Sequence, residues 1–163
     1  MKGFAPGLFD KLMGDNAYTS SFSTVTRLSM EDLKDTVARD LEALLNTRSV
    51  MQEDLLKSYP ECSKSIVSYG LNDFAGLSLA STDDRAYICR CLEKTISLHE
   101  PRLRNVSASL ELQEGSINRL NFAISAMLVV HPAKEPVSFD AVLQPSTLHY
   151  SISKTRRTAR KGE

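Results

Sequence analysis

The chain has 163 residues, of which 42% are hydrophobic and 25% charged, so its length favours one domain with a substantial core. Lysine and arginine together number 20, as do aspartate and glutamate, which gives a formal net charge of zero. This balance argues for neither general nucleic-acid binding nor binding to an anionic membrane surface.

The first 28 residues lack the pattern of a stable element. Proline, glycine and a polar run favour a flexible N-terminal docking arm over residues 1–28. Within it, Leu8, Phe9 and Leu12 could line one side of a helical turn and dock on this domain or on a partner, while a frayed terminus is the alternative. The chain opens without the apolar run of a signal peptide, and no stretch reaches the length of a membrane span. We therefore expect a cytoplasmic protein without direct membrane insertion.

A first amphipathic helix is predicted from about Met30 to Asn46, with Ser29 as its N-cap. The apolar residues that recur at the helical period are Leu33, Val37, Leu41, Leu44 and Leu45. Asn46 is expected to end the helix in a left-handed conformation, and Arg48 suits the negative end of the helix dipole.

The middle of the chain predicts one short and one long helix. Residues 61–69 are expected to form a short helix that ends at Gly70. The long helix is expected to begin near Thr82, as its N-cap, and to run to His99. Its face is mostly apolar, so both long helices need a neighbouring element to cover them.

The remaining chain alternates apolar and polar residues, as strands do. The predicted strands cover residues 104–113, 120–130, 137–143 and 148–152, with a hairpin turn at 114–116. One apolar face per strand is typical of an antiparallel sheet covered on one side. We therefore predict an α+β fold, a small antiparallel-rich sheet covered on one face by two amphipathic helices, as a single domain over residues 29–153. The basic residues 154–163 are predicted to be a disordered tail.

The corner between the long helix and the first strand reads Glu100-Pro101-Arg102. Proline cannot lie inside a helix and pushes the preceding residue toward an extended conformation, so the helix should end by His99 or Glu100. A carboxylate and a guanidinium then flank a rigid corner, and arginine can grip a carboxylate at two points. These charges either solvate a turn or face a partner.

Motifs for catalysis, metal or cofactor binding are missing from the sequence, so we predict no catalytic residue, no metal site and no cofactor. The cysteines are Cys62, Cys89 and Cys91, and we expect them to be small buried residues in a reducing compartment. Glu100 could be one of the two carboxylates of a glycoside hydrolase, but Arg102 favours its ionised form, which cannot act as a general acid. A peptidoglycan hydrolase is therefore the lesser alternative.

Five segments, in order along the chain, resemble the TssE family of lysozyme-like wedge subunits in type VI secretion baseplates, and the related wedge proteins of contractile phages. They are L-F-D-K-L at 8–12, R-D-L-E-A-L-L-N-T-R at 39–48, S-I-V-S-Y-G-L-N-D at 65–73, E-P-R-L at 100–103, and F-D-A-V-L at 139–143 followed by Pro145. Each segment is a weak signal, but five in the right order are specific.

The resemblance implies a lysozyme-like baseplate wedge fold and a non-enzymatic structural adaptor, at a cytoplasmic baseplate on the inner face of the inner membrane. It implies as partners the wedge proteins TssF, TssG and TssK and the sheath proteins TssB and TssC, with no nucleic acid. The partner-binding residues that it suggests are Glu100, Pro101, Arg102, Arg48, Leu8, Phe9 and Leu12. It also implies that the sheet faces the first sheath ring, where sheath strands could pair with an open edge. A small cytoplasmic regulatory binding protein of the same fold is a further alternative.

Overall fold

The computed structural model describes residue 4 and residues 28–51, 53–74, 76–78, 81–111, 120–144 and 146–155. The predicted docking residues Leu8, Phe9 and Leu12, the hairpin turn at 114–116 and most of the basic tail lie outside these residues. The described helices and strands are α2 (Met30–Asn46), α3 (Glu53–Lys57), α4 (Thr82–His99), β1 (Leu103–Glu111), β2 (Leu120–Val130), β3 (Ala133–Gln144) and β4 (His149–Lys154).

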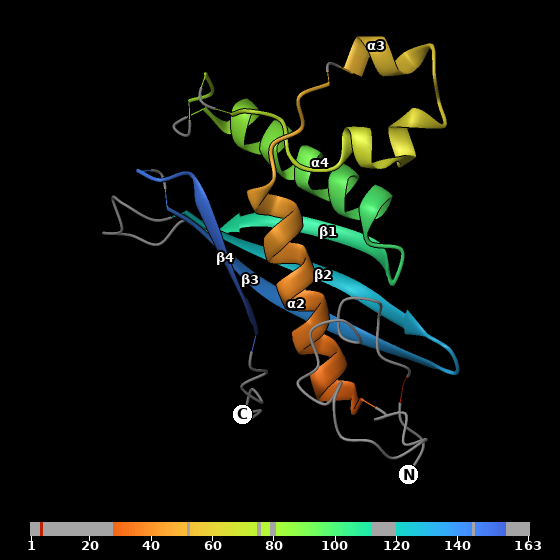
Figure 1. Ribbon diagram of the computed structural model, residues 1–163. Helices are drawn as coiled ribbons and strands as arrows, with labels where there is room; N and C mark the ends of the chain where they lie inside the picture. The colour runs from red at the N-terminus through yellow and green to blue at the C-terminus, as the bar shows by residue number, and fades with distance from the viewer. Residues whose placement is uncertain are drawn as a thin grey trace, which may run out of the picture.

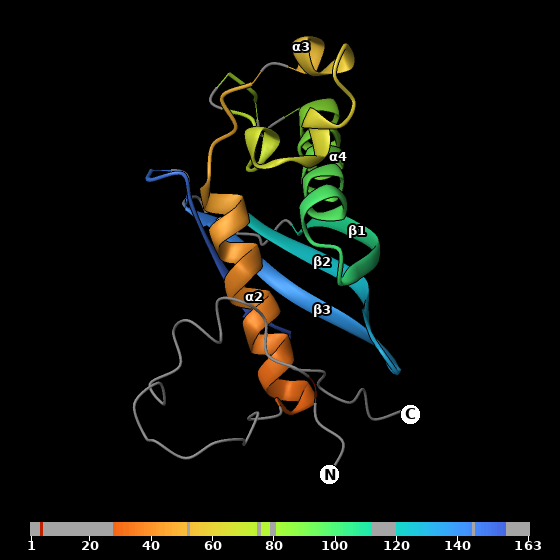
Figure 2. The ribbon, with the colours of Figure 1, turned by 45° about the vertical axis from the view of Figure 1, so that its right-hand side comes forward.

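The four strands form one antiparallel sheet in the order β1-β2-β3-β4, and α2 and α4 pack on one face of it (Figures 1 and 2). The predicted α+β architecture is therefore confirmed. Strand β2 has the predicted bounds, because its alternating pattern runs without interruption between two turns. The register of β1 against β2 shifts between Arg104 and Ser107, and Asn105 within this bulge has a φ of 52°.

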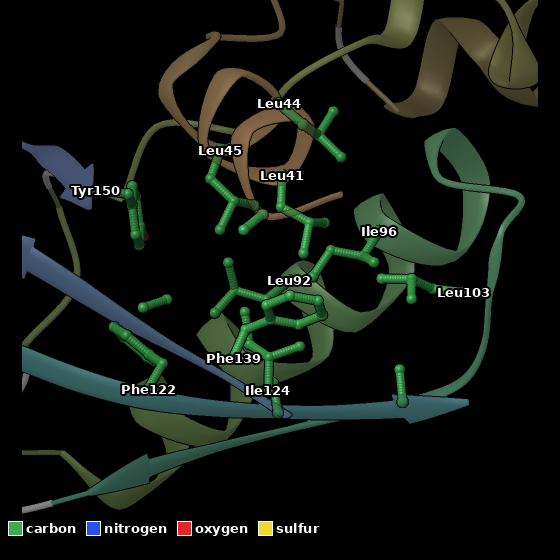
Figure 3. Close-up of a cluster of buried hydrophobic side chains, with 14 of the residues drawn as sticks. Leu41, Leu44, Leu45, Leu92, Ile96, Leu103, Phe122, Ile124, Phe139 and Tyr150 are labelled. Carbon is green, nitrogen blue, oxygen red and sulfur yellow. The ribbon is translucent and has the colours of Figure 1, made fainter. Parts of the chain in front are cut away.

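The hydrophobic core fills the space between the two helices and the inner face of the sheet (Figure 3). Helix α2 contributes Leu41 and Leu45, and α4 contributes Leu92 and Ile96, each of them fully buried. Phe122, Ile124 and Phe139 meet them from β2 and β3. The apolar faces that the helical and strand periods predict thus pack together into one core.

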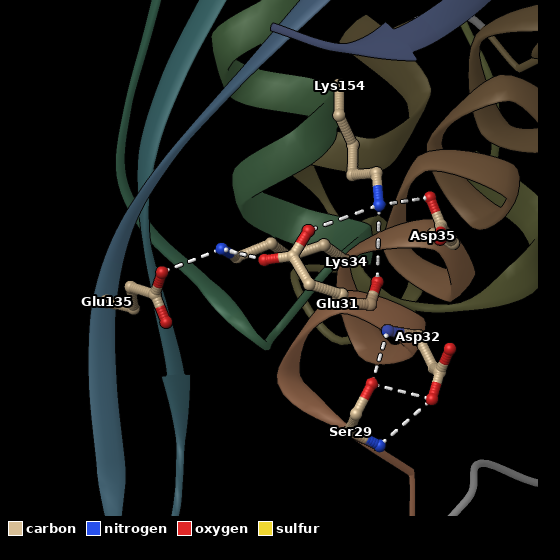
Figure 4. Close-up of polar contacts among 7 residues, drawn as sticks. All are labelled: Ser29, Glu31, Asp32, Lys34, Asp35, Glu135 and Lys154. Carbon is tan, nitrogen blue, oxygen red and sulfur yellow. Dashed lines mark hydrogen bonds and ion pairs between the residues drawn. The ribbon is translucent and has the colours of Figure 1, made fainter. Parts of the chain in front are cut away.

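Polar side chains fix the start of α2 against the sheet (Figure 4). Ser29 caps the helix as predicted, and it forms a reciprocal capping box with Asp32. Lys34 reaches Glu135 of β3 at 2.6 Å, and this hydrogen bond raises the pKa of Lys34. Lys154 of β4 binds Asp35 of α2 at 2.7 Å. These pairs orient α2 over the two strands, although each exposed pair contributes little to stability.

Two helix predictions were wrong, and in both cases side chains form hydrogen bonds that the prediction did not include. Asn46 does not end α2 in a left-handed conformation; Thr47 follows in an extended one, with φ −86° and ψ 137°. Residues 61–69 form two 3-10 turns, Cys62–Lys64 and Ile66–Ser68, instead of one helix, and the short helix α3 was not predicted. The serine hydroxyls of this segment bond to nearby backbone carbonyls, which favours turns over a helix.

Two smaller corrections concern caps and cysteines. Ser81, one residue before the predicted Thr82, caps α4 through a bond from the Asp84 N–H. Cys62 is exposed and the other two cysteines are partly buried, so the expectation of small buried residues is wrong for Cys62. Cys62 lies in the serine-rich turns, which contribute no buried residue to the core.

Tyr150 of β4 is the largest fully buried side chain of the described residues, and it packs against Phe122 with ring centroids 6.3 Å apart. Its hydroxyl finds no hydrogen-bond partner among the described residues. Burial raises the pKa of Tyr150 to about 12. An unpaired buried hydroxyl of this kind costs about 1–3 kcal/mol.

We expect Tyr150→Phe to leave the free energy of unfolding at pH 7 unchanged or raise it by about 1 kcal/mol, since the substitution removes an unsatisfied group. Between pH 10 and about 12 the unfolded chain loses the Tyr150 proton before the folded chain does, so wild-type stability falls as the pH rises through this window. Over the same pH range, the free energy of unfolding of Tyr150→Phe should decrease by up to about 3 kcal/mol less than that of the wild type. Denaturant melts across this pH range measure both effects, and Tyr59→Phe, at a side chain 66% exposed, is the matched control. Parallel pH profiles for the wild type and Tyr150→Phe would contradict the assignment.

Candidate interaction site

Backbone hydrogen bonds form the corner that follows α4. Helix α4 ends at His99, as predicted from Pro101, and the Glu100 N–H still donates to the Ile96 carbonyl at 2.8 Å. The Leu103 N–H then donates to the Glu100 carbonyl at 3.1 Å, which closes a turn around Pro101. Strand β1 starts directly at Leu103, so the corner has little freedom.

The Arg102 guanidinium joins this corner to α2. Its Nε and Nη2 donate to the two carboxylate oxygens of Glu100 at 2.7 and 2.5 Å, and the Arg102 N–H adds a third bond at 3.1 Å. The same Nη2 donates to Asp40 Oδ2 at 2.5 Å, from the middle of α2. Hydrogen bonding to Glu100, followed by the nearby charges, raises the pKa of Arg102 against the opposing effect of burial. A guanidinium that binds a carboxylate through two nitrogens fixes the position of the carboxylate as well as balancing its charge.

This geometry corrects the expectation that Glu100 and Arg102 present opposite charges to another subunit. The residue Glu100 is only 5% exposed, and both its carboxylate oxygens are bonded to Arg102. The Arg102 side chain is 26% exposed, and Pro101 at the tip is exposed. The outward surface of the corner is therefore Pro101 with part of Arg102, because the charged groups are needed to hold it in place.

Two residues of this cluster were not among the predicted site residues. Asp40 borders the apolar stripe of α2, which is the place where a polar side chain can meet a neighbouring element. Tyr69 packs edge-on against His99 with ring centroids 5.3 Å apart, and burial, with the Asp40 and Glu100 charges, raises its pKa. Both lie within the motif segments at 39–48 and 65–73, which is the signal that could have selected them.

The predicted residue Arg48 belongs to a second junction, at the end of α2. The backbone there pairs with Leu71: the Leu71 N–H donates to Thr47 O at 2.8 Å, and the Ser49 N–H donates to Leu71 O at 2.9 Å. Gly70 makes this approach feasible, because it has a φ of 111° and an added Cβ would lie 2.5 Å from Thr47 O. The Arg48 side chain is exposed and donates to the Leu148 carbonyl at 3.0 Å. Among the described residues, no hydrogen bond or ion pair joins Arg48 to the Glu100 corner.

Side chains of α2 and α4 form hydrogen bonds with outward-facing backbone groups of the two edge strands, β4 and β1. The Asn46 amide accepts from the Tyr150 N–H at 2.8 Å and donates to the Tyr150 carbonyl at 2.9 Å, as a neighbouring strand would. Glu42 accepts from the Ile152 N–H at 2.8 Å on the same edge. At the opposite edge, Glu93 of α4 accepts from the Ala108 N–H at 2.8 Å. The edges are therefore less open than the sequence suggested.

Metal ligation and membrane crossing can be checked in the described residues. None of their histidine, cysteine and acidic side chains form a group of three that could hold a metal ion. Within the same residues, no helix is long and apolar enough to cross a membrane.

A family model described as baseplate wedge protein gp25 matches residues 31–133, which is more than half of the chain. The chain therefore belongs to the gp25 family of baseplate wedge proteins, and it is a TssE-like structural component of a contractile injection system. A search of curated proteins found no match. The family is structural, which suggests a protein that is not an enzyme.

The Arg102 cluster predicts a stability effect. Arg102→Ala leaves the buried Glu100 carboxylate unpaired, so we expect the free energy of unfolding to fall by about 3–5 kcal/mol. Adding Glu100→Gln should recover part of this loss, because the unpaired charge is gone. Arg104→Ala, at an exposed position two residues further on, is the matched control and should change stability by less than about 0.5 kcal/mol. Urea melts measure all three variants, and equal stability of Arg102→Ala and Arg104→Ala would contradict the cluster.

The Gly70 junction gives an independent prediction. Gly70→Ala forces a Cβ against the Thr47 carbonyl at a strained φ, so we expect a loss of about 2 kcal/mol or more. Gly76→Ala, where an added Cβ meets nothing within 4 Å, should lie within about 0.5 kcal/mol of the wild type. Thermal melts of the two variants make the comparison. A Gly70→Ala melt that coincides with that of Gly76→Ala would show that the junction tolerates a side chain.

Proposed function

We propose that this baseplate wedge component is a TssE adaptor of a type VI secretion system. It links the wedge core of TssF and TssG, with TssK as a further wedge partner, to the contractile sheath of TssB and TssC, and it helps sheath assembly to start. The observation that carries the proposal is the rigid corner: Arg102 holds Glu100 and Asp40 together and leaves Pro101 exposed at the tip.

The corner is suited to docking on the wedge core because it is ordered before any partner arrives. Side chains that are already fixed lose little conformational entropy on binding, which strengthens an interface of a given size. In this proposal Pro101 and the outer part of Arg102 contact the wedge core directly. Glu100 acts by position, since its carboxylate is bonded to Arg102. Arg48, and Leu8, Phe9 and Leu12 of the arm, are proposed as further contacts.

The sheet supports the proposed contact with the sheath. No described helix covers its second face, where short side chains lie side by side; one row pairs Ser107, Ser125 and Ser138 across three strands. This row of serines allows another subunit to approach closely at that place, beside the longer side chains of Met127 and Lys134 on the same face. Strand addition at the β4 edge would have to displace the Asn46 and Glu42 side chains, whereas contact through the open face displaces nothing. We place this adaptor at the cytoplasmic baseplate, on the inner face of the inner membrane.

The same corner argues against hydrolysis. A glycosidase needs one carboxyl group that donates a proton, and the Glu100 oxygens accept bonds from Arg102 instead. A muramidase assay on the purified protein tests this directly. Turnover that is lost in Glu100→Gln would overturn the adaptor proposal in favour of an enzyme.

Pro101→Trp tests docking at the exposed tip of the corner. The added ring extends from this tip, so we expect binding to purified TssF–TssG to weaken at least tenfold, while a cooperative urea melt shows that the variant is still folded. Biolayer interferometry with immobilised wedge core gives the affinity. Ala86→Trp, at an exposed position in the first half of α4, is the matched control and should bind as the wild type does.

Three results separate the outcomes of this experiment. Weakened wedge binding by folded Pro101→Trp, with intact Ala86→Trp, supports the corner as the docking surface. Equal binding by all three proteins would overturn it. The TssB–TssC interaction, measured with the same proteins, should be unaffected by Pro101→Trp, because the corner and the open sheet face are proposed to serve different partners.

A further inference from the structure

The segment between α2 and α4 forms a surface that neither the core nor the proposed contacts use. In both views, α3 and the two 3-10 turns lie beyond α4, away from the sheet (Figures 1 and 2). A cavity of about 360 Å³ lies between this segment and α4. Its apolar lining includes Met51, Leu56, Pro60 and Leu98. The segment therefore builds one wall of a groove and α4 builds the other.

The segment that forms one wall of this groove also carries several exposed apolar side chains. Val50 is 91% exposed, Ile66 87% and Tyr59 66%. Most of the large hydrophobic side chains that are exposed in the described part of the chain lie between residues 50 and 67. Such a concentration in one stretch of the chain favours an interaction site. The cavity and the exposed residues are two independent signs of a missing neighbour.

The charges of the groove indicate the chemistry of that neighbour. Lys57 and Lys94 line it, and no aspartate or glutamate is among its described lining residues. Asp54 binds Lys57 at 2.6 Å, but both side chains are more than three-quarters exposed, so an incoming carboxylate can replace Asp54 at little cost. Lys94 also has an interaction of its own, but this residue is exposed, so an incoming carboxylate can replace that interaction as well. The groove thus combines an apolar floor with two exposed lysines at its margin.

We propose that this groove, defined by α3, the two 3-10 turns and the outer side of α4, binds an amphipathic segment of a partner protein that carries a row of apolar side chains flanked by acidic residues. The apolar row fills the cavity and covers Ile66 and Tyr59, as a helix lies in a groove. The acidic residues meet Lys57 and Lys94. A segment fits better than a small molecule, because Tyr59 and Ile66 of the same stretch are exposed but do not line the cavity. This binding surface is separate from the Pro101 corner.

A designed peptide is the probe for the groove. It is an 18-residue helix former labelled with fluorescein, with leucine at positions i, i+3, i+4 and i+7 and glutamate on the flanks. A second peptide replaces every glutamate with lysine. Fluorescence anisotropy with the full chain should show binding of the acidic peptide that is at least tenfold tighter than that of the basic peptide. The charge difference at Lys57 and Lys94 is the reason.

Variants on α4 locate the binding. Thr95→Trp fills the cavity and should weaken binding of the acidic peptide at least tenfold. Ser97→Trp, at an exposed position outside the lining, should leave that binding unchanged. If Thr95→Trp fails to fold, Leu98→Glu places a carboxylate on the apolar floor and should have the same effect. Pro101→Trp should leave peptide binding intact, so failure of the corner proposal and failure of this proposal are distinguishable.

Several results would contradict the proposal that the groove binds an acidic amphipathic segment. One is equal binding of the acidic and basic peptides, and another is no binding of either. A third is unchanged affinity in folded Thr95→Trp or Leu98→Glu. A fourth is a concentration-dependent dimer, seen by sedimentation, that excludes the acidic peptide, because the groove would then bind a second copy of this chain.

Discussion

Arg102 holds together two parts of the chain that lie far apart in sequence, and much of the structure depends on this contact. Its guanidinium binds Glu100 beside it and Asp40, 62 residues earlier on α2. Helix α4 must end where Pro101 ends it, because one turn more or less would carry Glu100 away from α2. The cluster therefore sets the position of α4 and β1 relative to α2, and the hydrophobic core packs within that frame.

The other shared motifs act in the same way, through contacts between distant element ends. The Asn46 amide bonds to both backbone groups of Tyr150, and the Leu71 backbone pairs with Thr47 and Ser49 across Gly70. Each contact satisfies backbone groups that would otherwise be unpaired at the end of a helix or the edge of a sheet. Motif residues in this family member thus hold distant element ends together, and Pro101, the motif residue that they leave exposed, is the proposed docking tip.

Sequence reasoning succeeded where structure is decided locally. The alternation of β2 and the capping serine of α2 placed both elements to the residue, because side-chain period and cap chemistry need no distant partner. It failed where a distant group decides. Asn46 was assigned a left-handed cap because its sequence neighbours favour one, but Tyr150, 104 residues away, takes its amide. The partner-binding site stays a prediction, but the sequence did select Glu100 and Arg102, which the structure pairs with each other. Their orientation also depends on Asp40, which lies in the motif segment 39–48 and was not selected, because its contact with Arg102 joins residues 62 positions apart.

The edge contacts also limit the ways in which the sheet could make the proposed contact with the sheath. Pairing a new strand with β4 forms several backbone hydrogen bonds, but it first breaks those of Asn46 and Glu42, and each protein hydrogen bond contributes only about 0.5–1.5 kcal/mol net. Edge pairing is therefore largely an exchange of equivalent bonds, and its net gain must come from side-chain burial. The open face, which carries Met127 and Val129 beside the serine row, offers that burial without any exchange. A sheath subunit that uses both surfaces would release α2 from the β4 edge, and it would thereby loosen the helix that holds Asp40 against the Pro101 corner.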